Sequence, residues 1–141
     1  SDKTKEGLYQ CELIPFIKGI EDEVPFIMMG HISLPNVVGD DTPASLSKTI
    51  VTDLLIDELG YQGIIITDAL NMGAVSQQYS SAQAAVKALN AGVDMLLMPA
   101  DFDAAYQGVL EAVQRGEISE SRIDESLGKI LKTKISMLEE E

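Results

Sequence analysis

The polar side chains with the best claim to chemistry stand directly after short apolar runs. Asp68 follows three isoleucines and a threonine, the only histidine, His31, follows a methionine-rich run, and Asp101 follows a third run. A carboxylate in such a position is costly to bury unless it is paired, hydrogen-bonded or used. In parallel α/β folds, the residues just beyond the carboxyl ends of the strands build the active site. Asp68 is therefore the first candidate for a catalytic group.

Each candidate also has a purely structural interpretation. Asp68 could cap a turn through Ala69 to Ala74, because helix N-caps favour aspartate. A lone histidine is commonly a structural hydrogen-bond donor, so His31 could either face a pocket or hold the fold together. Asp101 is better interpreted as a helix cap than as a ligand. Met72 lies in the loop after Asp68 and is expected to form a wall of a pocket.

The sequence does not indicate a cofactor. No two types of metal ligand converge at a recognisable spacing, so we expect no metal. The glycine patterns GxGxxG and GxxxxGK[ST] are both missing, which argues against a phosphate-binding enzyme. The methionines of the apolar runs are expected to fill gaps in the core.

Composition limits the possible partners. The chain has 141 residues, 45% of them hydrophobic, which is enough for one domain with a real core. Ten basic residues against 23 acidic ones give a net charge of −13, which argues against nucleic acid. No apolar run is long enough to span a bilayer, so we expect a soluble chain. The single cysteine, Cys11, excludes an internal disulfide.

The apolar runs predict the strands that position the candidates. Val24 to Gly30, Gly63 to Thr67 and Val93 to Met98 lack polar alternation, as is typical of strands buried on both faces of a parallel sheet. Helical patterns separate and flank them. We expect helices over Leu8 to Ile20, from Thr42-Pro43 to Gly60, from Ser80 or Ser81 to Gly92, from Asp101 to Arg115-Gly116, and from a Ser119 cap with an Ile118 staple to Leu138.

This alternation of helices and strands indicates right-handed βαβ units and a single α/β domain over residues 1–141. Three parallel strands alone would leave two apolar sheet edges with unpaired amides. We therefore expect the chain either to form part of a larger barrel or to associate with itself through those edges.

Longer motifs add a resemblance. The stretch Asp41 to Val75, DTPASLSKTIVTDLLIDELGYQGIIITDALNMGAV, resembles the nucleophile region of family 3 glycoside hydrolases. That region carries a Pro-Ala-Ser/Thr-Leu-Ser start, a Leu-Gly-Phe/Tyr-x-Gly turn, an apolar strand and a Ser/Thr-Asp pair. Met28-Met29-Gly30-His31 and the segment Lys87 to Pro99 are similar to two further family segments. The resemblance thus runs over essentially the whole chain.

The resemblance implies a fold and an activity. It implies the C-terminal portion of a TIM (β/α)8 barrel, its last three βα units, with Asp68 as the nucleophile of a retaining reaction. Asp68-Ala69-Leu70-Asn71-Met72 and the lack of tryptophan are similar to the β-N-acetylhexosaminidase branch, although many members of that branch have a second Asp where Ala69 stands. The expected substrate carries terminal N-acetylglucosamine, as in bacterial cell-wall fragments and peptidoglycan recycling. His31 and Met72 are expected to contact the sugar.

Two family segments are missing from this sequence. Neither Lys-His-Phe-Pro-Gly-His-Gly nor the Asp-x-His acid/base loop occurs here, and His31 belongs to a different strand. General acid catalysis is typically worth about 10² to 10⁴ in rate, so we expect the piece alone to have little or no hydrolytic activity. The alternative is a noncatalytic half-barrel that serves assembly or weak sugar binding.

Overall fold

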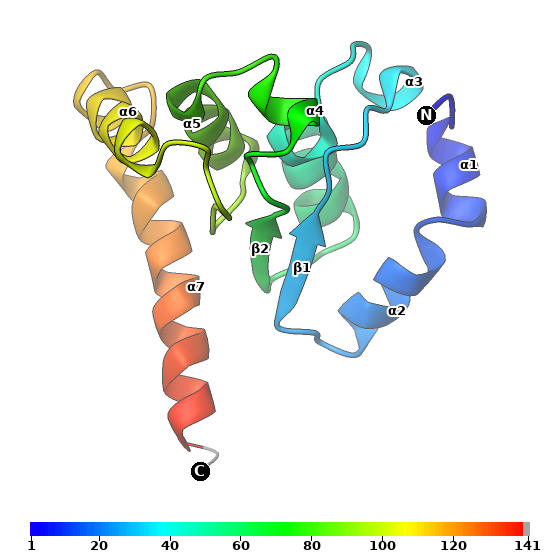
Figure 1. Ribbon diagram of the computed structural model, residues 1–141. Helices are drawn as coiled ribbons and strands as arrows, with labels where there is room; N and C mark the ends of the chain where they lie inside the picture. Colours follow the sequence, from blue (N-terminus) through cyan, green and yellow to red (C-terminus); the bar gives the residue numbers. More distant parts are fainter. Residues whose placement is uncertain (140–141) are drawn as a thin grey trace.

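The computed structural model describes residues 1–139 and gives an α/β fold around a short parallel sheet (Figure 1). The two strands pair in parallel, with Ile27 opposite Ile65 in the register. In chain order the elements are α1 (Lys5–Gln10), α2 (Ile14–Glu21), β1 (Phe26–Met29), α3 (Pro35–Val38), η1 (Ala44–Leu46), η2 (Thr49–Glu58), β2 (Ile64–Thr67), α4 (Gly73–Ser76), α5 (Ser81–Ala91), α6 (Phe102–Gln114) and α7 (Glu120–Glu139).

One face of the sheet is covered by helices, whereas the other is open at β1. Ile27 and Ile65 are buried in the main core cluster together with residues of η2 and α5. On the opposite face of β1, Phe26 and Met28 are 41% and 51% exposed. Strand residues alternate between the two faces, so this difference follows directly from the pleat.

The third expected strand pairs with β2 through a single bridge and a few backbone hydrogen bonds, so that prediction was wrong in extent. Met95 forms one parallel bridge with Ile66, and the N–H of Leu97 turns to the side-chain Oγ1 of Thr67 instead of a carbonyl. The backbone of Met98 then enters the left-handed region at φ 47°. The carbonyls of Leu97 and Met98 accept from the loop after β2, so this end of the segment follows that loop and does not continue a regular ladder.

The helices follow the predicted punctuation in part. Ser80 caps α5 in a reciprocal capping box with Gln83, and Gly92 ends that helix at φ 113°. The predicted helix over Leu8 to Ile20 is broken into α1 and α2, and Pro15 occupies the first turn of α2, where its missing N–H costs no hydrogen bond.

The expected helix start at Thr42-Pro43 was wrong. Pro43 forms an antiparallel bridge with Ser33, and the N–H of Ala44 donates to the carbonyl of Ile32. These contacts hold the segment against the chain that leaves β1. The long helix η2 therefore begins later, at Thr49, and its hydrogen bonds follow the wider π pattern, as the bond from Leu59 N–H to the Leu54 carbonyl illustrates.

The last two helices form a separate layer at one side of the sheet (Figure 1). Gly108 of α6 faces Ala82 of α5 so closely that a side chain there would collide with it, which lets these helices pack tightly. Ile118 is buried and packs against Ile123, as the predicted staple requires. Beyond its first turns, α7 extends away from the rest of the molecule. None of the helices within residues 1–139 is both long and apolar enough to cross a membrane.

Candidate active site

Asp68 lies at the carboxyl ends of the two paired strands. Its backbone N–H donates to the carbonyl of Met29 at 2.8 Å, which continues the pairing one residue beyond the strands. The side chain is half-buried, and its Oδ1 accepts the N–H of Ala69 at 2.7 Å. The N-cap of the following helix α4 is Met72, so Asp68 does not cap that helix. Within residues 1–139, its Oδ2 makes no hydrogen bond.

The loop that follows Asp68 is fixed through its backbone. The N–H of Leu70 donates to the carbonyl of Leu97 at 2.9 Å, and the N–H of Asn71 donates to the carbonyl of Met98 at 3.0 Å. Leu70 is also buried. The irregular end of the third segment thus has a defined role, because it provides two acceptors for the loop.

His31 holds the same loop from the other side. Its Nδ1 lies 2.8 Å from the Oγ of Ser45, and its Nε2 lies 2.9 Å from the carbonyl oxygen of Ala69. Ser45 is fully buried, and its own N–H donates to the carbonyl of Gly30. The imidazole therefore connects the end of β1, the η1 turn and the residue next to Asp68.

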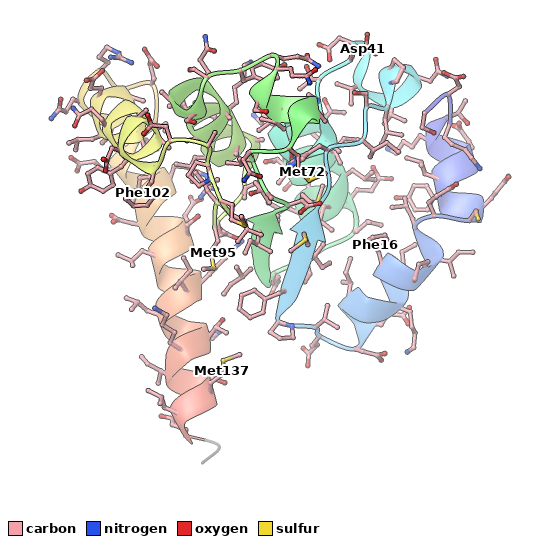
Figure 2. The ribbon with its side chains drawn as sticks, viewed as in Figure 1. Phe16, Asp41, Met72, Met95, Phe102 and Met137 are labelled. Atoms are coloured by element: carbon pink, nitrogen blue, oxygen red, sulfur yellow. The ribbon has the colours of Figure 1, made fainter. Side chains whose placement is uncertain are left out.

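The other predicted candidates have separate locations. Met72 is 45% exposed and lies near the carboxyl ends of the strands (Figure 2). The prediction of a cap at Asp101 is confirmed, since its Oδ1 accepts the N–H of Ala104 at 2.9 Å at the start of α6. Thus Asp68, His31 and Met72 gather at one end of the sheet, whereas Asp101 serves a helix.

Two residues of this region were missed from the sequence. Thr67 is fully buried, and its Oγ1 accepts the N–H of Leu97 at 3.0 Å. Ser45 supports His31 from the η1 turn. The signal for Thr67 was its position beside Asp68, because successive strand residues face opposite sides of a sheet. Ser45 stood in the Pro-Ala-Ser-Leu-Ser motif, but that motif did not indicate a contact with His31.

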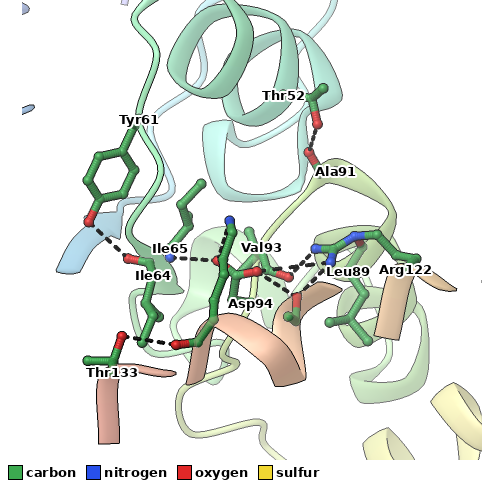
Figure 3. Close-up of polar contacts among 12 residues, drawn as sticks. Thr52, Tyr61, Ile64, Ile65, Leu89, Ala91, Val93, Asp94, Arg122 and Thr133 are labelled. Atoms are coloured by element: carbon green, nitrogen blue, oxygen red, sulfur yellow. Dashed lines mark hydrogen bonds and ion pairs between the residues drawn. The ribbon is translucent and has the colours of Figure 1, made fainter. Parts of the chain in front are cut away.

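A second polar cluster surrounds Asp94 near the opposite end of β2 (Figure 3). The Oδ2 of Asp94 accepts the N–H of Ile65 at 2.9 Å and lies 3.2 Å from the Nζ of Lys129. Its Oδ1 accepts the hydroxyl of Ser126 at 2.6 Å and lies 4.0 Å from a guanidinium nitrogen of Arg122. An acid within an apolar run was the available sequence signal, because a buried carboxylate must be satisfied.

Arg122 and Tyr61 extend this cluster. Arg122 donates to the carbonyls of Leu89 and Val93 at 2.9 and 2.7 Å, which ties α7 to the end of α5. Tyr61 is buried, and its hydroxyl donates to the carbonyl of Val24 at 3.0 Å. Burial, with a smaller contribution from the Asp94 charge, raises the pKa of Tyr61 to about 12. The Asp94 cluster therefore links α7 to β2 and to the end of α5.

A carboxylate at the carboxyl ends of parallel strands, on a loop fixed by hydrogen bonds, is the arrangement in which parallel α/β domains place their active-site residues. Comparison with known proteins identifies the family. Residues 1–133 match the glycosyl hydrolase family 3 N-terminal domain. The chain therefore belongs to glycoside hydrolase family 3.

Individual relatives agree with this assignment. The chain is 32% identical to β-hexosaminidase A of Pseudoalteromonas piscicida, over 96% of this chain and 26% of that protein. It is 35% identical to a β-hexosaminidase of Chromobacterium violaceum, over 73% of this chain and 29% of that protein. The solved family 3 β-N-acetylglucosaminidase of Paenibacillus sp. str. FPU-7 superposes with a TM-score of 0.90 at 38% identity, covering 94% of this chain and 26% of that structure.

These relatives, two β-hexosaminidases and a β-N-acetylglucosaminidase, support the hexosaminidase branch of the family for this chain. The chain spans only about a quarter of the length of these relatives.

Proposed function

We propose that this chain supplies the nucleophile of a retaining β-N-acetylhexosaminidase, and that Asp68 is that nucleophile. The observation that carries the proposal is the position of Asp68 at the carboxyl ends of β1 and β2, with one carboxylate oxygen oriented by Ala69 N–H and the other unbonded within residues 1–139. The unbonded oxygen would attack the anomeric carbon and form a covalent glycosyl-enzyme.

The surrounding loop suits this role. An attacking carboxylate must be held in a near-attack position, and a misplacement of about 1 Å can cost about 10²-fold in rate. The backbone bonds from Leu70 and Asn71 to the third segment fix the loop against the sheet. Met72, exposed in the same loop, would provide an apolar wall for the sugar. The sugar contact expected for His31 would require one of its present ring hydrogen bonds to break.

The rest of the catalytic machinery would come from other strands. We propose that the chain forms the last three βα units of a (β/α)8 barrel, with the bridge between Ile66 and Met95 marking the position of the third strand. The resemblance of the whole chain to one quarter of a β-N-acetylglucosaminidase supports this arrangement. The proton donor would lie on an earlier strand, so the isolated chain is expected to be inactive. Terminal N-acetylglucosamine of cell-wall fragments or related oligosaccharides is the proposed substrate.

The test is an Asp68→Ala substitution in the full-length parent protein. Hydrolysis of an aryl N-acetylglucosaminide should fall by about 10³-fold or more, since the covalent intermediate can no longer form. Added azide should restore turnover and give a glycosyl azide of the α configuration, because the anion attacks from the side that the carboxylate occupied. Asp103→Ala, an exposed acid in the first turn of α6, is the matched control and should retain activity. Activity of Asp68→Ala at the wild-type level would exclude Asp68 as the nucleophile.

A further inference from the structure

The environment of His31 points to a role other than binding the sugar. Both ring nitrogens already lie within hydrogen-bond distance of protein atoms, Nδ1 at 2.8 Å from Ser45 and Nε2 at 2.9 Å from the carbonyl of Ala69. A carbonyl oxygen can only accept, so Nε2 must carry the proton. In the neutral ring Nδ1 is then an acceptor, and the Ser45 hydroxyl donates to it. The partners thereby select one tautomer.

The hydrogen bonds from Ser45 to His31 and from His31 to Ala69 form a series that ends beside Asp68. Ser45 is fully buried, and its own N–H donates to the carbonyl of Gly30 at 3.2 Å. The first residue of this hydrogen-bond series is therefore held rigidly. The acceptor at the other end is the carbonyl of Ala69, whose N–H donates to the Asp68 carboxylate at 2.7 Å. The carbonyl of Ala69 therefore accepts from the imidazole of His31, and the N–H of Ala69 donates to the Asp68 carboxylate.

We propose that His31 is a positioning residue for the reaction at Asp68. It donates its Nε2–H to the Ala69 carbonyl and so fixes the orientation of the Ala69 backbone, whose N–H donates to the Asp68 carboxylate. This proposal rests on the proposed function of Asp68. It differs from sugar binding in its kinetic consequence. A positioning residue changes the rate of attack, whereas a sugar contact of equal strength in the ground and transition states changes KM.

Two variants of similar size separate the ring nitrogens. His31→Gln places an amide nitrogen near the position of Nε2, so it can still donate to Ala69. His31→Asn reaches only as far as Nδ1, so it keeps a contact with Ser45 and loses the one with Ala69. His31→Leu removes both. In the full-length parent protein, kcat and KM for an aryl N-acetylglucosaminide should be measured for all three.

The expected result is a fall in kcat of about 10²-fold for His31→Asn and His31→Leu, with KM nearly unchanged. His31→Gln should recover kcat to within about tenfold of the wild type. Amide hydrogen exchange at Leu70 and Asn71 should become faster in the Asn variant and stay slow in the Gln variant. If the Leu variant does not fold, the comparison of Gln with Asn carries the test.

Three outcomes would overturn the proposal. A rise in KM with unchanged kcat would mean that His31 binds the sugar. Equal losses of kcat in the Gln and Asn variants would mean that the contact with Ala69 has no role. Full activity of all variants would mean that His31 has no role in the reaction. Asp68→Ala, measured alongside, keeps the two proposals apart. If that variant is fully active, the nucleophile proposal fails. If it is inactive while His31→Asn retains the wild-type kcat, only the positioning proposal fails.

Discussion

Thr67 and Asp68 are adjacent in the sequence, yet their side chains have different environments because a strand turns successive side chains to opposite faces. Thr67 is fully buried and bonds to the third segment, whereas Asp68 is half-exposed at the sheet edge. Thr67 thus stabilises the arrangement that holds Asp68 at the carboxyl ends of the strands. Buried polar groups of this kind need a partner, and each one here has one among residues 1–139.

Tyr61 provides a prediction for the dependence of stability on pH. Its pKa is raised from 10.0 in the unfolded chain to about 12, mainly by burial. Below about pH 10 the phenol is protonated in both states, so its full contribution is present. As the pH rises past 10, the unfolded chain loses the proton first, and about 2 kcal/mol of stability should be lost between pH 10 and pH 12.

The measurement is urea unfolding at about pH 9 and about pH 11. Tyr61→Phe should lose less stability between the two conditions than the wild type does, because the titrating group is gone. Tyr106→Phe is the matched control, since Tyr106 is 64% exposed and should leave the wild-type loss unchanged. Equal pH dependence in the wild type and in Tyr61→Phe would contradict the assignment.

From the sequence, a site residue could be predicted only where its position next to a strand determines its location. Asp68 and His31 follow strands, so their arrival at a common edge could be inferred from the parallel arrangement alone. The hydrogen-bond partner of His31, Ser45, could not be inferred in this way. Ser45 reaches the imidazole because Ala44 and Ser45 bond to Ile32 and Gly30, and such a contact between separate segments leaves no periodic trace.

At the scale of elements, cap residues were informative and strand lengths were not. Ser80, Gly92 and Asp101 act where expected because a cap depends on residues within one turn. The segment from Val93 to Met98 has the composition of a strand but forms only one bridge. Beyond that bridge the N–H of Leu97 bonds to the Thr67 side chain and Met98 adopts a positive φ, so the tertiary contacts of this segment, and not its composition, end the ladder.

The attachment of α7 depends on Asp94, and this yields a stability prediction. Asp94→Ala should destabilise the chain by about 3–5 kcal/mol, because it leaves the cations of Arg122 and Lys129 and the N–H of Ile65 without their buried partner. Asp94→Asn should cost less, since the amide oxygen can still accept from Ile65. Urea unfolding measures the loss, and amide exchange at Ile65 reports it locally.

The control for this prediction is on the same helix. Asp124 is an exposed acid of α7, and Asp124→Ala should change the free energy of unfolding by no more than about 0.5 kcal/mol. A loss for Asp94→Ala as small as that of the control would mean that the cluster does not hold α7 to the sheet.

For the whole molecule, the apolar surfaces are distributed at two sides. An apolar groove of about 260 Å³ lies between α1, α2, η2 and β1, and β1 has no strand partner on that side within residues 1–139. At the other side, α7 exposes an apolar stripe along its length: Leu127, Leu131, Ile135 and Leu138. Neither surface includes Asp68, so these are surfaces for packing rather than for chemistry.

Such surfaces predict that the chain of 141 residues associates in solution. Light scattering should give a mass of a dimer or more. The net charge of −13 opposes this association through repulsion between copies, so added salt should screen the charge and increase the mass. Purely electrostatic contacts would weaken with salt instead, which makes the direction of the change diagnostic.

Paired substitutions identify the surface that is used. Met28→Lys adds a charge to the open face of β1, and Leu131→Lys adds one to the stripe of α7; the two side chains are 51% and 49% exposed. Because an edge strand offers unpaired backbone groups as well as apolar side chains, β1 should be the stronger contact, and Met28→Lys should lower the mass more than Leu131→Lys. A single species with the mass of the monomer at high concentration and high salt would contradict the prediction. It would mean that neither the open edge of β1 nor the stripe of α7 drives association.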